Sequence, residues 1–492
     1  MIGSFPDLYP DELLYSGLAR YEDWMGYSAK GTLLRELYGK ETVIPALDWP
    51  NRLDYLAAAL PPGHHYTAAV LMDQHTLLPA YAPFLLPERL ARVREYMRST
   101  TGRQAIYALT GVGPGTSSPV RELQFCPVCV EEDRHRYGET YWHRLHHVPG
   151  VLVCPTHQVW LETTRTSYRQ VGSNHVFVPA ERIMTSTRVR ELDLTRSDQA
   201  ILVAIAQENA WLLNHPALPL DLAGLHARYR ACLVEQGLQT YAGYLRLPPL
   251  MEAFRAAYSP QLLQMLGCEL NPQHRIAWPI NLLRNRNRTL PPVRYILMAR
   301  LLGHTLESLL SLSPALKPFG EGPWPCLNPA AAHYREPCIL DDQVTWTLSD
   351  KGQPIGIFAC ECGFVYWRGG PDQSPDDRFR YWAIIETGPV WDALLCQLWN
   401  DLAVTHEAIR ERLRVGWQVL EKRALRLALP FPRPSLFPPR SPHPRPVFPP
   451  PPQPKPPRDP APYRAIWLEG LGRFPDAITS ELRARFSREY DW

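Results

Sequence analysis

The sequence predicts a mainly α-helical, multidomain protein with helix-turn-helix-type helical domains and two small zinc-stapled modules. A chain of 492 residues is long enough for about three domains of ~150 residues each. Apolar residues recur at helical spacing in long stretches. Ten cysteines are present, mostly at short spacings near histidine, which favours metal binding in a reducing compartment over a disulfide framework.

The composition limits the classes of partner. The formal net charge is only +3, so a nucleic-acid function must depend on local basic patches. The first residues have neither a basic segment nor the apolar segment of a leader, and no apolar run reaches the roughly 18 residues needed to cross a bilayer. We expect a soluble, cytoplasmic protein that does not contact a membrane.

The first predicted domain covers residues 1–190. It contains helix-compatible runs such as Asp11–Arg20 and Pro87–Met97, separated by proline and glycine. Leu13, Leu14 and Leu18 recur at helical spacing, which is typical of an amphipathic helix packed on a core.

A first zinc module is expected within this domain, at residues 124–162. Cys126 and Cys129 form one pair with two intervening residues, and Cys154 and His157 form a second pair after 24 intervening residues. Four such ligands fit a closed, tetrahedral structural zinc site. Short β-prone stretches between residues 148 and 161 indicate a ribbon or knuckle with little core of its own, so the metal must stabilise its fold.

Residues 191–320 are predicted to form a helical domain of the DNA-binding type. Its helical runs include Ala200–Leu213 and Pro249–Tyr258, and no Asp or Glu lies between Leu270 and Leu306. Arginine and asparagine alternate in this acid-free segment and can donate hydrogen bonds to phosphates and base edges. The predicted DNA contacts are Arg284, Arg286, Arg288 and Arg294. The alternative is a solvated loop before a core helix.

A second zinc module is expected at residues 321–370. Five side chains compete for four ligand positions, and we favour Cys326, His333, Cys360 and Cys362 over sets that use Cys338. The Cys360–Gly363 stretch is typical of a knuckle between two strands, because glycine permits the unusual dihedrals of its turn. The sequence therefore predicts two structural Zn²⁺ ions.

Residues 371–429 are predicted to form a helix-turn-helix-like domain, with helices throughout Tyr381–Leu429. A helix at Thr405–Leu413, a glycine turn at Arg414–Gly416 and a helix at Trp417–Leu427 fit that layout. The residues expected to pack the two helices are Ala408, Ile409, Leu413, Val415, Leu420 and Ala424. The residues expected to face DNA are Gln418, Lys422, Arg423 and Arg426. An ordinary helical hairpin is the alternative.

The C-terminal part is predicted to be an extended spacer followed by a short helical unit. Residues 430–462 contain 17 prolines in 33 positions, so they form a linker of roughly 100 Å at ~3.1 Å per residue. Residues 463–492 are expected to form the short helical unit.

No enzyme motif is present: the chain has no Walker loop, no Gly-x-Ser-x-Gly elbow and no His-Glu-x-x-His. One catalytic alternative is a metal-dependent nuclease built from acids and histidines around the first zinc module. The residues concerned are Glu131, Glu132, Asp133, His135, His143, His146 and His147. Four protein ligands would leave no open position for water on the zinc, so we expect no catalytic activity.

The motifs together resemble a known family. They are Phe125–Cys129, Gly138–His147, Pro149–His157 with Leu161, Phe5–Ser16, His75–Pro79, Trp324–Pro329 with His333 and Tyr334, and Cys360–Tyr366. In these patches, from the start to about Arg368, the chain closely resembles the TniQ/TnsD family of transposition target selectors. Its length and second cysteine segment are more similar to TnsD than to a minimal TniQ.

The resemblance implies a prokaryotic, nucleoid-associated protein that binds double-stranded DNA at a fixed chromosomal attachment site. It implies recruitment of the AAA+ ATPase TnsC through the N-terminal region, with TnsC in turn engaging the transposase. The alternative is a TniQ-type adaptor that docks on an RNA-guided effector complex and leaves target reading to the guide RNA.

Overall fold

The computed structural model describes residues 2–27, 30–41, 43, 46–99, 103–111, 122–167, 177–184, 188–216, 222–270, 277–284, 289–434 and 461–473. These residues contain twenty α-helices and ten β-strands, so the predicted helical character is confirmed, and the strands form small sheets. The chain divides into two compact units. One is Met1–Asn328 with Ala332–Gly388, and the other is Pro329–Ala331 with Pro389–Trp492.

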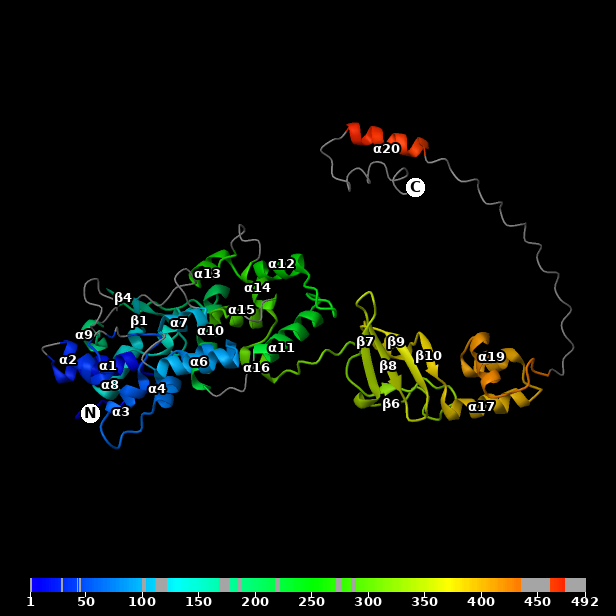
Figure 1. Cartoon of the computed structure of the whole chain (residues 1–492), viewed down its shortest axis with the longest axis horizontal. Coiled ribbons are helices and arrows are strands. Elements are labelled where there is room, and N and C mark those ends of the chain that lie inside the picture. Colours follow the sequence, from blue (N-terminus) through cyan, green and yellow to red (C-terminus); the bar gives the residue numbers. More distant parts are fainter. Residues whose placement is uncertain are drawn as a thin grey trace. The chain divides into compact units, whose positions relative to one another are not determined.

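The first unit begins with a large helical body (Figure 1). Its helices are α1 (Leu14–Met25), α2 (Lys30–Tyr38), α3 (Leu53–Ala59), α4 (Ala68–His75), α5 (Leu78–Tyr81), α6 (Pro87–Arg98), α7 (Arg103–Thr110), α8 (Pro127–Tyr137), α9 (Ala180–Ile183), α10 (Ser197–Asn214), α11 (Leu222–Glu235), α12 (Leu247–Ala257), α13 (Pro260–Met265), α14 (Trp278–Arg284), α15 (Pro292–Leu301) and α16 (Leu306–Ser311).

Local sequence explains where several of these helices begin and end. Thr67 caps α4, because its side chain accepts a hydrogen bond from the backbone N–H of Val70. Gly26 ends α1 in the left-handed region at φ 58°, which glycine adopts without strain. Helix α10 contacts α5, α15 and strand β2 (Val153–Cys154), so its apolar residues are buried on several sides.

The residues predicted to line the core of the N-terminal domain are buried. Leu13, Leu14 and Leu18 all have exposed fractions of 1% or less. Asp11, predicted to lie inside the first helix, instead precedes it with a left-handed backbone at φ 58°. This is a correction with a physical cause, because the Asp11 side chain is held by a distant arginine, as described below.

Four short strands surround the first metal module. They are β1 (Glu122–Phe125), β2, β3 (Val159–Trp160) and β4 (Glu162–Ser167). Strand β1 pairs with β4, and β2 pairs with β3, both antiparallel. The β2–β3 pair is the small ribbon expected between residues 148 and 161.

The second module of this unit is built on an antiparallel sheet in the order β10-β9-β8-β7. Its strands are β5 (Trp324–Pro325), β6 (Pro337–Ile339), β7 (Val344–Leu348), β8 (Pro354–Ala359), β9 (Val365–Gly369) and β10 (Ala383–Glu386). Alternate residues of β8 are buried, and Phe358 lies opposite Tyr366 of β9. The rings of Phe319 and Trp324 pack against Phe358.

Strand β10 corrects the prediction that Tyr381–Leu429 is helical throughout. Ala383, Ile384 and Glu386 pair with β9, with Ala383 opposite Trp367, so the sheet continues beyond residue 370. A four-residue segment is too short for its periodicity to distinguish strand from helix, and the pairing partner decides.

The second unit contains α17 (Gly388–Asn400), α18 (His406–Leu413), α19 (Trp417–Arg426) and α20 (Ala461–Arg473). Helices α18 and α19 end within one residue of their predicted C-termini. Arg433, inside the predicted linker, is buried and donates to the carbonyl oxygens of Trp399 and Val404. The described residues therefore extend into the predicted linker as far as residue 434, and residues 435–460 and 474–492 lie outside the described part. No helix among the described residues is long and apolar enough to cross a membrane.

The turn between α18 and α19 differs in detail from its prediction. The residue in the left-handed region is Arg414, at φ 53°, whereas Gly416 has φ −73° and is the N-cap of α19. Ile409, Leu413, Leu420 and Ala424 are buried as predicted. Ala408 is exposed, which corrects its expected packing role.

Candidate metal centres and DNA-reading helix

The first predicted ligand set comes together at the N-terminus of α8 and the β2–β3 ribbon. The ligand atoms of Cys126, Cys129, Cys154 and His157 all lie within 4.8 Å of one another. The His157 Nδ1 atom is 3.5, 3.3 and 3.5 Å from the three sulfurs in that order. The Cys129 and Cys154 sulfurs are 3.8 Å apart.

These separations fit a tetrahedral zinc ion. With Zn–S at about 2.3 Å and Zn–N at about 2.0 Å, two sulfurs lie about 3.8 Å apart and a sulfur and a nitrogen about 3.5 Å apart. The donor set of three thiols and one imidazole is also the one that zinc prefers. The residues present therefore fit the ion.

The local backbone explains how the first centre is held. Cys126 is the N-cap of α8, and its sulfur accepts a hydrogen bond from the backbone N–H of Cys129. Pro127 occupies the first turn, where its missing N–H costs nothing. The Nε2 atom of His157 lies 3.1 Å from Glu132, a carboxylate partner that orients the ring so that Nδ1 faces the sulfurs.

A buried arginine in the loop between the two ligand pairs connects distant segments. Arg144 donates to the Asp11 carboxylate at 3.1 Å, to the backbone oxygen of Asp73 at 2.9 Å and to that of Leu213 at 3.2 Å. The backbone N–H of Leu145 donates to the second Asp11 oxygen. This arrangement explains the left-handed backbone of Asp11 and gives the Trp142–His147 motif a structural role.

A second buried network lies beside it. Glu12 is fully buried and pairs with Arg20 at 2.9 Å, and Arg20 also pairs with Glu139 at 2.8 Å. Burial raises the pKa of Glu12 to about 7. The Nδ1 atom of His75 donates to the backbone oxygen of Glu12, and burial lowers the pKa of His75 to about 4. Sequence reasoning missed both networks, because their members lie far apart along the chain.

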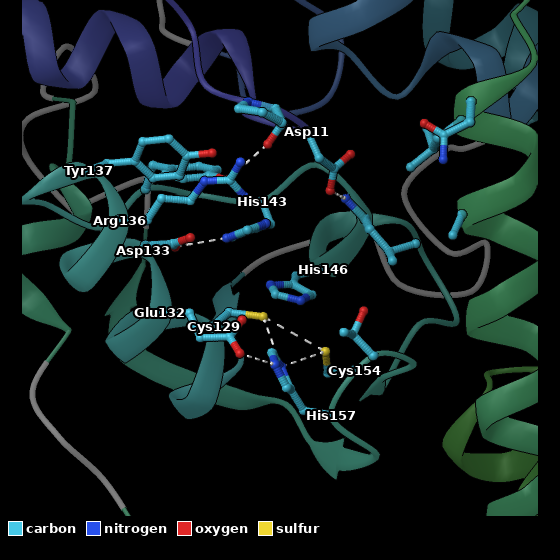
Figure 2. A pocket seen from close by; sticks show the side chains of 17 residues that line it. Asp11, Cys129, Glu132, Asp133, Arg136, Tyr137, His143, His146, Cys154 and His157 are labelled. Atoms are coloured by element: carbon cyan, nitrogen blue, oxygen red, sulfur yellow. Dashed lines mark hydrogen bonds and ion pairs between the residues drawn. The ribbon is translucent and has the colours of Figure 1, made fainter.

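A cavity of about 340 Å³ opens next to the first centre (Figure 2). Asp133 accepts hydrogen bonds from His143 at 2.9 Å and from Thr140 at 3.1 Å. His146 is buried at the wall of the cavity, and burial lowers its pKa. Figure 2 shows His143 and His146 between the Asp133 carboxylate and the Cys154 and His157 ligands.

The residues of the nuclease alternative are spread over several environments. His147 is in the core, where burial lowers its pKa to about 3 and its Nε2 atom accepts from the backbone of Gln124. Glu131 pairs with Arg134 at the surface, and His135 is exposed. In the described part of the chain these acids and histidines form no additional group with metal-ligand spacing.

The second predicted ligand set also comes together. The ligand atoms of Cys326, His333, Cys360 and Cys362 lie within 4.8 Å of one another. The Cys326 and Cys362 sulfurs are 3.7 Å apart, and Cys360 lies 3.3 Å from the Nε2 atom of His333. These separations again fit tetrahedral zinc. Cys338 is close as well, with its sulfur 3.8 Å from that of Cys360.

The knuckle of the second centre has the predicted form. Cys360–Gly363 lies between β8 and β9, the N–H of Gly363 donates to Cys360, and Gly363 has φ 85°. Asn328 is fully buried and donates to Cys326 through its backbone and to Cys362 through its side chain, both at 3.4 Å. Sequence reasoning missed Asn328, although its place two residues after a ligand is a usable signal.

The predicted basic segment is only partly described. Arg286 and Arg288 lie outside the described residues, and Arg284 is exposed at the end of α14. Arg294 has its guanidinium 5.3 Å from the centre of the Trp278 ring and donates to the backbone of Gly267. Its charge is therefore engaged within the helical body.

Helix α19 carries the remaining predicted DNA contacts. Gln418, Lys422 and Arg426 are exposed and follow one another at intervals of four residues, so they lie on one helical face. Arg423 is different, because it forms a two-pronged ion pair with Asp392 of α17 at 2.8 and 2.5 Å. This pair joins α19 to α17.

Comparison with known proteins agrees with these features. A family model described as Tn7-like transposition protein D matches residues 205–492, and the TniQ model matches residues 4–161. The chain is 28% identical over 293 residues to the transposon Tn7 transposition protein TnsD of Escherichia coli. The match covers 58% of this chain and 55% of that protein, so the chain spans about half the length of this curated relative.

The first family model covers more than half of the chain and includes the second metal module and helices α17–α19. The TniQ model includes the ligands of the first centre and Arg144 with two of its partners, Asp11 and Asp73. The chain therefore belongs to the Tn7-like transposition protein D family.

Proposed function

We propose that this protein selects the target site of a Tn7-like transposon by binding a specific sequence in double-stranded DNA. It would mark a chromosomal attachment site in the nucleoid and recruit the AAA+ ATPase TnsC, which engages the transposase. Family membership is the observation that carries this proposal.

Helix α19 is the proposed reader of base edges. In the helix-turn-helix layout the second helix enters the major groove, and here its exposed face carries Gln418, Lys422 and Arg426. Gln418 would donate and accept hydrogen bonds at a base edge, and the two cations would neutralise phosphates. Arg423 would position α19 on α17 through Asp392. Arg284, Arg286 and Arg288 would supply further phosphate contacts.

The two metal centres are proposed to hold structural Zn²⁺. Each offers four protein ligands at zinc-like separations, which leaves no coordination position open for water. When bound, the ion supplies only cross-linking. The first centre would hold α8 and the β2–β3 ribbon together. The second centre would join two hairpins.

The experiment is a binding selection with the full chain against a library of chromosomal fragments, followed by mapping of the protected segment. One enriched sequence with a continuous protected region is the expected result. Equal affinity for all fragments would exclude sequence-specific recognition by this chain.

Two substitutions test the proposed reader. Lys422→Ala should weaken binding to all sequences alike and lower the salt dependence by about one phosphate contact. Gln418→Ala should instead reduce the preference for the selected sequence by about 1–3 kcal/mol. Lys351→Ala, an exposed lysine outside α19, is the matched control and should change neither value.

The TniQ match to residues 4–161 supports a second candidate function, an adaptor that docks on an RNA-guided effector complex. Co-purification with such an effector, together with the absence of an enriched sequence in the selection, would favour it. The proposal that the chain is not an enzyme has its own test. Plasmid DNA incubated with the purified protein and magnesium, manganese or zinc should remain intact.

A further inference from the structure

The second metal centre has five potential donors for four positions. We propose that Cys326, Cys360 and Cys362 hold the ion permanently and that His333 and Cys338 are interchangeable fourth ligands. This inference depends on the proposed metal and not on the proposed role in DNA recognition.

The distances around Cys360 carry the argument. Two sulfurs on one tetrahedral zinc ion lie about 3.8 Å apart, given Zn–S at about 2.3 Å. Cys338 and Cys360 are 3.8 Å apart, which matches the 3.7 Å between Cys326 and Cys362. The Nε2 atom of His333 lies 3.3 Å from the same Cys360 sulfur. His333 and Cys338 therefore each lie at the distance from the Cys360 sulfur that is expected for two ligands of one zinc ion.

Backbone hydrogen bonds hold the segment that carries His333 and Cys338 beside Cys326. Residues Arg335 and Glu336 lie between His333 and Cys338, and Arg335 turns the chain with φ 68°. The N–H of Arg335 donates to the Cys326 oxygen at 2.7 Å, and the N–H of Cys326 donates to the Glu336 oxygen at 3.0 Å. His333 and Cys338 are both half-buried, so the two side chains can exchange by rotation while these backbone bonds persist.

Charge decides which rival is the resident ligand. Replacing a neutral imidazole by a thiolate makes the centre more negative by one elementary charge. Residues 317–388 contain ten Asp and Glu but only six Lys and Arg, so the module already carries excess negative charge. Repulsion among four thiolates held 3.7–3.8 Å apart also disfavours the four-thiolate form. His333 is therefore the resident ligand, and Cys338 is the reserve thiol.

Zinc analysis of the purified full chain tests the exchange. Wild type, His333→Ala and Cys338→Ser should each retain two zinc ions per chain, and the double variant should retain one. His333→Ala with one ion would show that Cys338 cannot ligate. If Cys338→Ser retains only one ion, His333 cannot act as the fourth ligand. Wild type with fewer than two ions would overturn the inference together with the metal proposal.

Cobalt substitution provides a spectroscopic readout that a merely structural cysteine would not change. His333→Ala reconstituted with Co²⁺ should gain sulfur-to-cobalt charge-transfer intensity relative to wild type, because a fourth thiolate replaces the imidazole. Cys338→Ser should retain the wild-type spectrum, and so should Cys396→Ser, a half-buried cysteine outside both groups. An unchanged spectrum in His333→Ala that still holds two ions would exclude Cys338 as the substitute ligand.

Discussion

The two metal modules share a donor chemistry but have different surroundings. The first is built into the helical body, where Cys126 begins α8 and Arg144, in the loop between the ligand pairs, binds three distant segments. The second joins a β5–β6 hairpin to the β8–β9 knuckle, and its sulfurs are contacted by the adjacent Asn328. The comparison indicates that loss of the first ion spreads through a core, whereas loss of the second remains local.

The largest expected effect comes from removing one ligand of each centre. Cys126→Ser and Cys360→Ser should each lose one of two zinc ions. Cys126→Ser should also lower the melting temperature more than Cys360→Ser does. The expected decrease for Cys126→Ser is about 10 °C, which corresponds to a loss of about 3 kcal/mol of domain stability. Metal analysis and thermal unfolding measure both values, with Cys396→Ser as the control. Equal melting temperatures, or two ions in Cys126→Ser, would refute the difference.

The Arg144 network should contribute much of the stability of the helical body that contains the first centre. Arg144→Met removes the donor to one Asp11 carboxylate oxygen and to two carbonyl oxygens, and it should lower the free energy of unfolding in urea by about 3 kcal/mol. Arg98→Met, which removes an exposed pair with Asp54, is the control and should cost less than about 1 kcal/mol. Similar losses for both variants would show that Arg144 does not hold the body together.

Removal of a polar side chain that contacts a ligand should lower zinc affinity more at the second centre than at the first, the reverse of the order expected for stability. Asn328→Ala should weaken zinc binding at the second centre about tenfold, because the buried side-chain donor to the Cys362 sulfur is lost. Glu132→Ala at the first centre should have a smaller effect, since the Glu132 side chain is 65% exposed. Competition with a chromogenic chelator measures both affinities. A larger loss in Glu132→Ala would reverse this part of the comparison.

The smallest effect concerns acid. Burial lowers the pKa of His75 to about 4 and that of His147 to about 3, so between these values and about 6.5 the unfolded chain binds more protons than the folded chain. These two histidines should therefore each lower stability by about 1 kcal/mol between pH 7.0 and 5.5, while the raised pKa of Glu12 acts in the opposite direction over this range. Residues 317–388 contain one histidine, His333, so this pH-dependent loss of stability belongs to the helical body.

The measurement is urea unfolding across that pH range. His147→Gln should reduce the pH dependence by the contribution of one histidine, while the exposed His135→Gln should leave it unchanged. An identical slope in wild type and His147→Gln would mean that His147 titrates normally in the folded chain.

Local pattern was sufficient for many features. The proximity of Cys126 to Cys129 and of Cys360 to Cys362 follows from their spacing, because a knuckle requires only a few residues of backbone. Helices such as α10 and α19 follow from apolar periodicity. Strand β10 could not be predicted this way, since its four residues acquire a definite conformation only by pairing with β9.

Sequence by itself determined the residue types and spacings of the two ligand sets, the helical character and the family resemblance. Only the tertiary structure decided which side chains meet across long separations. It paired Arg423 with Asp392, placed Arg294 against Trp278, joined Arg144 to Asp11 and brought Cys338 beside Cys360. The physical reason is that periodicity and spacing describe neighbours along the chain, whereas ion pairs and metal ligation depend on distances that packing alone sets.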